Sequence, residues 1–417
     1  MTHVVSGSVR KVADDLRINA ELIEVASDTP LWSEKFSGTV ANVFGFQEEI
    51  SQKIVNALQL RLTDAETEVL TERPIDNAAA YDCYMRARHE IFLFTAEGLD
   101  RAQKLVDSGL SLIGENPLLL ATRGLVSWYY LNFSIRPDVQ YLNEADAYAT
   151  KALEQDPKNW VGVFLRGLVA AKRGDIEITL RDLRTAHEQR PGDSMVVNEL
   201  IRHLTSAGQE LTESARPVYV ESLRLDPLHP LNWAQAAWRH FNAGRLEESM
   251  KAARRILQLT DRGNPGRVYA AYYFAIATKR AEAINLFDEE GAALAGTAYG
   301  SLSFFLSRAL QGDAEGAAIH VTPQLEKASS WTEYLALFLA DGYSLLGNSD
   351  TAMKWLRAAV DQGFINYPYL ANNDPFLVNV RFDSRFTELI LEVKQRWEAL
   401  TTSEKLKFES GSRIKKE

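Results

Sequence analysis

Histidine and cysteine side chains that could hold a metal ion are few in this sequence and poorly spaced. His89 and Glu90 begin the pattern H-E-x-x-H, in which two histidines on one face of a helix bind zinc. Leu93 stands where the second histidine should be. The chain has a single cysteine, Cys83, which excludes a zinc site made of several thiolates and also excludes an internal disulfide. The sequence therefore predicts no metal site.

Cys83 is also a poor candidate for a nucleophile. It lies in "AAYDCYMRARHEI" on the apolar side of a predicted helix, where no neighbouring base would activate its thiol, so we expect a small buried hydrophobic residue. The acidic run at 288–290 is typical of a solvated helix end. His203 and His240 fall on helices that could line a groove, although histidines in such places are more often hydrogen-bonded or solvent-facing.

Sequence patterns that bind nucleotides or activate a serine are also missing. There is no G-x-x-x-x-G-K-[ST] phosphate loop, no G-x-G-x-x-G after a strand and no G-x-S-x-G turn. The loop signatures of kinases and the paired aspartates of a metal-dependent cyclase are not recognisable. We therefore expect no cofactor and no enzymatic activity, and we expect the function to lie in a binding surface.

Composition restricts the class of partner. The 417 residues are 46% hydrophobic and 24% charged, as in ordinary globular proteins. The formal net charge of -10 disfavours nucleic acids and anionic membranes as partners, because both need an excess of Lys and Arg. The sequence starts without a signal-peptide pattern, no apolar run approaches the ~18 residues of a membrane span, and one cysteine fits a reducing compartment. We expect a cytoplasmic protein.

The first 73 residues predict a small α/β domain. "VVSGSVRKVADDLRINAELIEV" contains two strands joined by a two-Asp turn, and "LWSEKF" adds a third strand. A helix in "FQEEISQKIVNALQLRL" follows, and Pro74 marks the boundary. The helix carries one apolar stripe that would cover the sheet, formed by Phe46, Ile50, Ile54, Leu58 and Leu62.

From residue 77 to 362 the sequence repeats at intervals close to 34 residues. Glycines fall where a turn between helices is expected, and Pro157, Pro191 and Pro227 follow predicted helix ends. A second small residue often follows seven positions after the first. The small residue that opens the second helix of each pair is Ala102, Ala145, Thr179, Ala215, Ser249, Ala283, Ala317 and Ala352.

This spacing predicts helical hairpins, because two antiparallel helices approach closely only where side chains are small. The period is that of the tetratricopeptide repeat, and such hairpins stack into a right-handed α-solenoid. We expect a mainly α protein with about eight hairpins, of which the sixth and seventh are weakest because Glu290 and Gln324 occupy small-residue positions. Residues 363–400 should cap the solenoid, with a helix from Ser384 to Leu400 capped by Asp383 or Ser384, and 401–417 should be a flexible tail.

The N-terminal block resembles the second half of the TolB amino-terminal-like domain. The matching residues are Gly7-Ser8-Val9-Arg10, Arg17-Ile18, Leu31-Trp32-x-Glu34 and Phe46-Gln47-x-Glu49-Ile50. "DPFLVNVRFDSRF" is similar to the segment that often closes the repeats of such proteins. The resemblance implies a bacterial signalling protein in which the repeats follow an adenylate cyclase, a Ser/Thr kinase or a winged-helix domain.

Neither that effector nor the first βα half of the TolB-like domain is found in this sequence. Two explanations of the open sheet remain. Its missing part belongs to sequence outside this chain, or its edge pairs with another molecule, for example in a homodimer.

For the repeats, we expect first helices to line a concave groove. Aromatic residues there would anchor a peptide or protein partner, although several could instead be inter-helix core, as we expect for Trp128, Trp160 and Trp233. The candidate groove residues are Tyr130, Phe164, Trp238, Tyr272, Tyr334 and Phe338.

The leading hypothesis is a non-enzymatic scaffold of a signalling protein. One alternative is the regulatory C-terminal part of an adenylate cyclase or other effector. A weaker one is a small-molecule site between the α/β block and the first hairpin.

Overall fold

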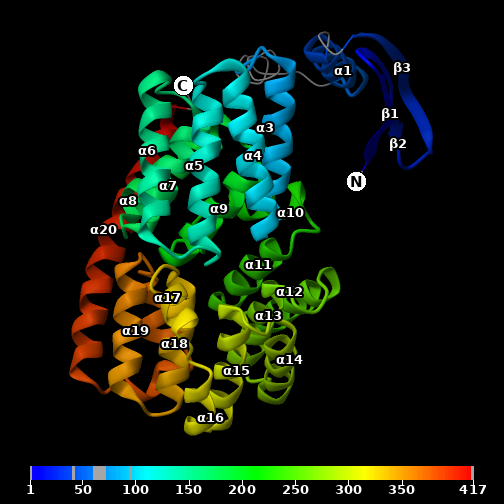
Figure 1. Ribbon diagram of the computed structural model, residues 1–417. Coiled ribbons are helices and arrows are strands. Elements are labelled where there is room, and N and C mark those ends of the chain that lie inside the picture. Colours follow the sequence, from blue (N-terminus) through cyan, green and yellow to red (C-terminus); the bar gives the residue numbers. More distant parts are fainter. Residues whose placement is uncertain (1, 40–42, 60–71, 94, 415–417) are drawn as a thin grey trace. The chain divides into compact units, whose positions relative to one another are not determined.

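The computed structural model describes residues 2–39, 43–59, 72–93 and 95–414, with side chains up to residue 403. The predicted mainly α fold with a small N-terminal α/β block is confirmed (Figure 1). The chain divides into two compact units, one of residues 1–93 and 100–119 and the other of 94–99 and 120–417. This division groups the first hairpin with the α/β block, so the domain limits expected from the sequence stay a prediction.

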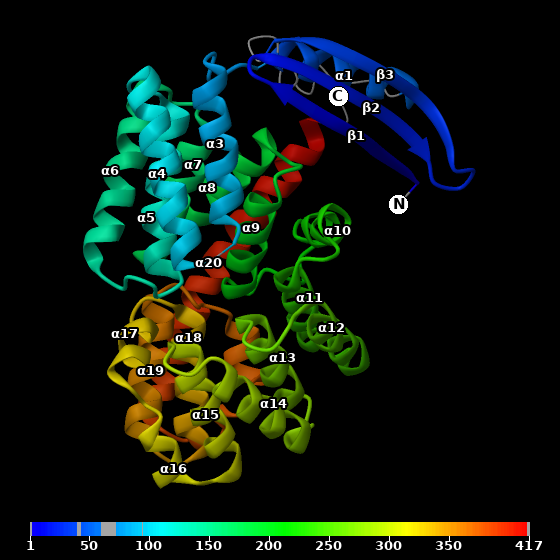
Figure 2. The same cartoon turned by 45° about the vertical axis from the view of Figure 1, so that its right-hand side comes forward.

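The three predicted strands form an antiparallel sheet in the order β1-β2-β3. They are β1 (His3–Val12), β2 (Asp15–Glu24) and β3 (Thr29–Thr39). The turn between β1 and β2 uses Ala13 and Asp14, with Ala13 at a positive φ of 53°, and Asp15 already pairs with Val12. Figure 2 shows the three strands side by side, with β1 at the free edge.

Helix α1 (Val43–Ala57) covers the sheet over β3, as its apolar stripe predicts. The ring centroids of Phe46 and Phe36 lie 6.0 Å apart, and Lys53 pairs with Glu34 at 2.7 Å. Leu62, the last residue of the stripe, lies outside the described residues. The covered face of the sheet is buried at Leu16, Ala20, Leu22 and Phe36.

The rest of the described chain forms eight helical hairpins and a closing segment, and Asn and Asp side chains cap many of the helices. In chain order the hairpins are α3 (Ala78–Ile91) with α4 (Ala96–Ile113), α5 (Pro117–Asn132) with α6 (Val139–Gln155), α7 (Trp160–Lys172) with α8 (Ile176–Gln189), α9 (Ser194–Ser206) with α10 (Arg216–Leu225), α11 (Pro230–Asn242) with α12 (Leu246–Leu259), α13 (Pro265–Ile276) with α14 (Arg280–Ala293), α15 (Ala298–Gln311) with α16 (Ala314–Ile319) and α17 (Pro323–Ser329), and α18 (Glu333–Leu345) with α19 (Ser349–Asp361).

The residues that define the repeat lie where close packing requires them. All eight small residues that open the second helices have an exposed fraction of 0%. Four turn glycines have positive φ, between 71° and 76°, which only glycine adopts without strain; they are Gly174, Gly244, Gly312 and Gly347. Helices α6, α8 and α10 end two residues before the three prolines, as predicted.

The sixth and seventh hairpins accommodate their irregular residues in different ways. Glu290 is completely buried, and its carboxylate accepts hydrogen bonds from Arg267 Nε at 2.5 Å and from the Gly263 amide at 2.8 Å. In the seventh hairpin the second helix breaks before Pro323 and restarts as α17. Gln324 is therefore exposed, and Leu325 and Ala328 take the buried positions.

The chain closes with a π-helical turn η2 (Tyr369–Asn373), a 3-10 turn η3 (Leu377–Asn379) and helix α20 (Ser384–Ile414). Asp383 caps α20 by accepting the Arg385 amide at 2.9 Å, as expected. The predicted helix end at Leu400 is wrong, because α20 continues through residues that we expected to form a tail. Within the described part of the chain, no helix has the length and apolarity needed to cross a membrane.

Candidate functional site

The six aromatic residues expected in the groove are all buried. Their exposed fractions are at most 5%, and a side chain without exposed surface cannot contact a partner. Their expected position in an open groove is therefore corrected to the alternative, inter-helix core. Four of them meet: Trp238 lies 6.5 Å from Tyr272 and 5.9 Å from Tyr334, and Tyr272 lies 4.2 Å from Phe338, between ring centroids. The other two, Tyr130 and Phe164, are buried in earlier hairpins.

Of the three tryptophans that we expected in the core, two are buried and one is not. Trp128 is fully buried, and its Nε1 donates to the Leu168 carbonyl at 3.0 Å. Trp160 is buried as well, whereas Trp233 is only half-buried.

The groove is closed because hairpins far apart in the sequence meet across it. Lys172 Nζ, at the end of α7, donates to the Trp331 carbonyl at 2.6 Å, and Arg202 of α9 pairs with Glu333 of α18. Ser206 also donates to the Tyr334 hydroxyl at 3.3 Å. The inner face of the stack thus becomes an interior.

The segment between α19 and α20 fills what remains of the groove. The Ile365 amide donates to the Ser206 carbonyl at 2.8 Å, Asn366 Nδ2 donates to the Thr205 carbonyl at 2.8 Å, and the Tyr369 hydroxyl lies 2.7 Å from that of Tyr272. Five large apolar side chains of the segment have exposed fractions of 0%: Phe364, Ile365, Tyr369, Leu370 and Leu377.

Burial indicates that this segment is part of the folded interior of the repeats. Burying a large apolar side chain contributes about 1.5–3 kcal/mol, so five contribute on the order of 10 kcal/mol before the entropy cost of ordering the segment. Helix α20 secures the segment further, because Trp397 Nε1 donates to the Gly208 carbonyl at 3.1 Å.

A buried ionic cluster connects α7, α9 and α18. Burial alone would lower the pKa of Arg202, but Glu333 and Glu199 raise it, and Arg202 Nε donates to Glu199 at 2.9 Å. Burial lowers the pKa of Lys172 to about 8. The pKa of His203 is held well below its usual range by burial and then by Arg202. His203 is therefore a neutral core residue, and the ionic cluster stabilises the contact of α7 and α9 with α18.

Two buried carboxyl groups lie on the other side of the aromatic cluster. Asp341 accepts a hydrogen bond from the Tyr272 hydroxyl at 2.7 Å. Burial, reinforced by Asp374, raises the pKa of Asp341 well above its usual range, and burial raises the pKa of Asp374 to about 6. Paired carboxyl groups could exchange protons with a substrate, but these are at most 1% exposed, so they serve the packing.

Other candidates for chemistry are equally unpromising in the described residues. There, no three His, Cys, Asp or Glu side chains gather closely enough to hold a metal ion. Cys83 is half-buried rather than fully buried, and burial raises the pKa of its thiol, which lowers its reactivity.

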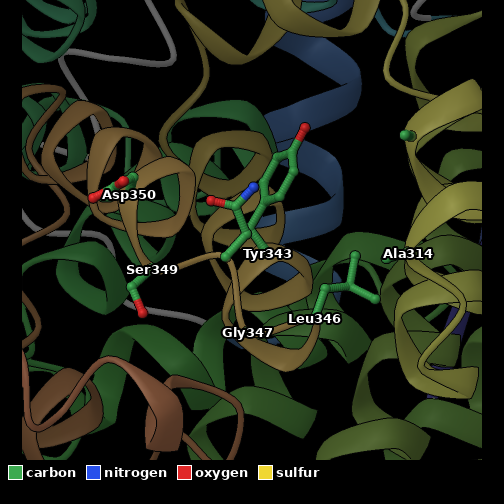
Figure 3. Close-up of a pocket in the computed structure, with 8 residues that line it drawn as sticks. Ala314, Tyr343, Leu346, Gly347, Ser349 and Asp350 are labelled. Carbon is green, nitrogen blue, oxygen red and sulfur yellow. The ribbon is translucent and has the colours of Figure 1, made fainter.

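One open cleft lies between the seventh and eighth hairpins (Figure 3). Its volume is about 600 Å³, and it is lined by Tyr343 of α18, by Leu346 directly after α18, by Asp350 of α19 and by residues of α16. Ile319, one residue beyond the lining residue Ala318, is 78% exposed.

Phe382 is a second exposed apolar side chain, connected to the cleft through the chain. It is 95% exposed and lies three residues before Arg385, whose guanidinium pairs with Asp350 at 2.9 Å. The cleft is lined by Ala314, Ala318, Tyr343, Leu346, Gly347, Asn348, Ser349 and Asp350. We call these residues with Ile319 and Phe382 the hairpin cleft.

Sequence reasoning missed the hairpin cleft, and it missed the contacts that close the inner groove between α7, α9 and α18. The closure pairs residues more than 100 positions apart, such as Arg202 and Glu333, and no local pattern connects them. The cleft lies beside the short helix α16, and the helix break before Pro323 was the one available signal in the sequence.

Comparison with known proteins finds a partial sequence relative. No protein-family model matches the chain. Over 110 residues, or 26% of this chain, the sequence is 34% identical to putative adenylate cyclase 3 from Rhizobium meliloti (strain 1021), and the match spans 19% of that protein.

Several solved structures are similar to the chain. A tetratricopeptide repeat protein from Parabacteroides merdae is 17% identical, with a TM-score of 0.42, over 68% of this chain and 99% of that one. A thermophilic tetratricopeptide repeat protein from Thermus thermophilus is also 17% identical, with a TM-score of 0.36, over 47% and 100%. A human IFIT1 dimer with m7Gppp-AAAA is 14% identical, with a TM-score of 0.45, over 87% and 88%. These scores are low, so the fold rests on the helices described above.

Proposed function

We propose that the chain is a non-enzymatic protein-interaction module of a bacterial signalling protein, and that its partner binds in the hairpin cleft. The observation that carries this proposal is a contrast in exposure. The inner face of the repeats is filled by residues 363–383, whereas the cleft is open. Ile319, which follows the lining residue Ala318, is 78% exposed, and Phe382, three residues before the Arg385 that pairs with Asp350, is 95% exposed. Large exposed apolar side chains beside a cleft are typical of an interaction site.

The charges around the cleft suggest the chemistry of the partner. Asp350 has a side chain that is 87% exposed, and Glu315 of the short helix α16 is exposed as well. Tyr343 and Leu346 supply apolar surface. A peptide segment that carries an aromatic or aliphatic anchor next to a Lys or Arg would match both features.

Affinity capture with paired variants tests this assignment. The full chain is compared with an Ile319→Asp/Phe382→Asp variant and with a control, Val220→Asp/Leu228→Asp, whose targets are 62% and 65% exposed on another hairpin. We expect the cleft variant to lose the partners that the wild type and the control retain, with circular dichroism unchanged in all three. Retention of the same partners by the cleft variant would reject the proposal.

A second candidate function is the regulatory part of an adenylate cyclase or other effector. It is favoured by the identity of 34% to a putative adenylate cyclase over 110 residues, and by the sheet and α1, which suit a partial TolB-like domain. The open reading frame upstream of Met1 should then continue into an effector. In either case the chain alone, incubated with ATP and Mg²⁺ or Mn²⁺, should produce no cyclic AMP; measurable turnover would contradict the non-enzymatic proposal.

We also propose a cytoplasmic location, because a single cysteine fits a reducing compartment. Fractionation of the native host with an antibody to the chain would check it.

A further inference from the structure

The two edges of the N-terminal sheet differ in how they are protected. Strand β3 contains Pro30, and a register irregularity interrupts its pairing with β2 between Leu22 and Ile23. It also carries the charged residues Glu34 and Lys35, and Glu34 is tied to α1 by its ion pair with Lys53. Proline, irregular pairing and charge are the devices that prevent an edge strand from adding another strand.

Strand β1 has no proline and no register irregularity, and its two charged residues, Arg10 and Lys11, lie near its end. Its residues 4–9, "VVSGSV", contain no charge and no proline, and the strand pairs regularly with β2 along its whole length. Val5 and Val9 are 54% and 68% exposed. They stand directly opposite Leu22 and Ile18, so they belong to the face of the sheet that α1 covers over β3. Among the described residues, the apolar face therefore continues, without a cover, to the edge formed by β1.

The pattern of β1 is complementary to itself. In an antiparallel pair of β1 strands centred on Gly7, Val5 of one copy would stand opposite Val9 of the other. Arg10 and Lys11 of one copy would then stand opposite Val4 and His3 of the other, so the like charges would not face each other. A parallel pair would place Arg10 against Arg10 and Lys11 against Lys11, which like-charge repulsion disfavours.

We infer that β1 is a homodimerisation strand, which pairs antiparallel with β1 of a second copy around Gly7. The two sheets would then form one continuous sheet of twice the width, with both α1 helices on the same face. This contact is independent of the hairpin cleft, so each can fail without the other.

Sedimentation equilibrium of the full chain over a dilution series tests the dimer. We expect a mass that approaches twice 46.8 kDa as concentration rises. Val9→Lys should weaken dimerisation by about tenfold or more, because it places a charge opposite Val5 of the partner. The matched control is Val12→Lys, which changes the same residue type on the same strand at 58% exposure but outside the self-paired segment. It should dimerise like the wild type.

Cross-linking tests the register. In a Cys83→Ala background, a Val5→Cys/Val9→Cys variant should form a covalent dimer on oxidation. The two cysteines of one strand lie about 13 Å apart, too far for an internal disulfide. A Ser33→Cys/Ser37→Cys variant on β3 is the control and should stay monomeric.

Three results would overturn the inference. They are a monomer at every concentration, a dimer that Val9→Lys leaves intact, and equal cross-linking at β3. A monomer that binds a strand from another protein would also count against it.

Discussion

The inner face of the second unit and the sheet of the first unit start from the same kind of pattern and end in opposite states. Both present a regular apolar face, with Trp238 and Tyr272 in one and Val5 and Val9 in the other. The two aromatic residues are 1% exposed, whereas the two valines are more than half exposed. The difference is that residues 363–383 return to cover the inner face, while no described element covers β1.

This contrast teaches that an apolar face indicates where a contact forms but does not identify the molecule that makes it. Inside the second unit, residues 363–383 of the same chain cover the apolar face, and buried polar groups there are neutral or paired. Glu210, for example, accepts hydrogen bonds from Asn242 at 2.8 Å and from Asn366 at 3.0 Å. On the sheet, we propose that a second copy of the chain covers the apolar edge.

The largest effect is expected from emptying the closed face. Trp238→Ala should lower the free energy of unfolding by about 3–5 kcal/mol, because it leaves a cavity among Tyr272, Tyr334 and Tyr369. Urea denaturation measures this loss. The control on the same helix is Trp233→Ala, which should cost clearly less because Trp233 is only half-buried. Equal losses for the two variants would show that the inner face is open after all.

A somewhat smaller loss is expected where a charge is buried inside the closed unit. Arg267→Met should cost about 3 kcal/mol, since Glu290 then remains fully buried without its cation. The double variant Arg267→Met/Glu290→Ala should recover most of that loss, because alanine restores the small residue that most other hairpins have there. Denaturant midpoints compare the two variants. A double variant that is no more stable than Arg267→Met would reject this account of the sixth hairpin.

A pH-dependent effect of roughly 3 kcal/mol is expected at Glu210. Burial raises its pKa to about 7 from a value of 4.5. A carboxyl group whose pKa is raised in the folded state stabilises most at low pH, and that contribution disappears as pH rises through about 7.

The Glu210→Gln variant should remove this share of the pH dependence. Its stability relative to the wild type should therefore increase between about pH 5 and about pH 8. Thermal unfolding at a series of pH values measures the difference, and Glu213→Gln serves as the control, because that side chain lies in the same loop and is exposed. A difference that stays constant with pH would contradict the raised pKa.

The smallest effect on stability is expected at the open sheet. Val9→Thr should change the free energy of unfolding by no more than about 0.5 kcal/mol, because Val9 is 68% exposed and threonine keeps the strand preference. Unfolding is measured at a concentration where the chain is monomeric. A loss comparable to that of Trp238→Ala would mean that another part of the monomer covers β1.

The sequence alone was sufficient to predict most helices and strands and the contacts between neighbouring ones. Ala145, Ser249 and Ala352 were expected at close helix crossings, and all have exposed fractions of 0%. The turn glycines, the three strands and the Asp383 cap followed from the same kind of short-range rule. Each of these depends on residues within about one repeat, where the chain can meet itself at little entropic cost.

Only the tertiary structure decided which faces are free. Tyr334 has the spacing of a groove residue, but it is buried because Ser206, more than 100 residues earlier, meets it across the closed face. Glu290 departs from the repeat pattern, and its burial is possible because Arg267 pairs with it. The hairpin cleft lies beside α16, which ends after six residues. Periodic spacing fixes how each helix packs on its neighbour, whereas the closure depends on the sum of many small rotations between hairpins and on contacts between distant residues. These rotations and distant contacts cannot be predicted from any short stretch of the sequence.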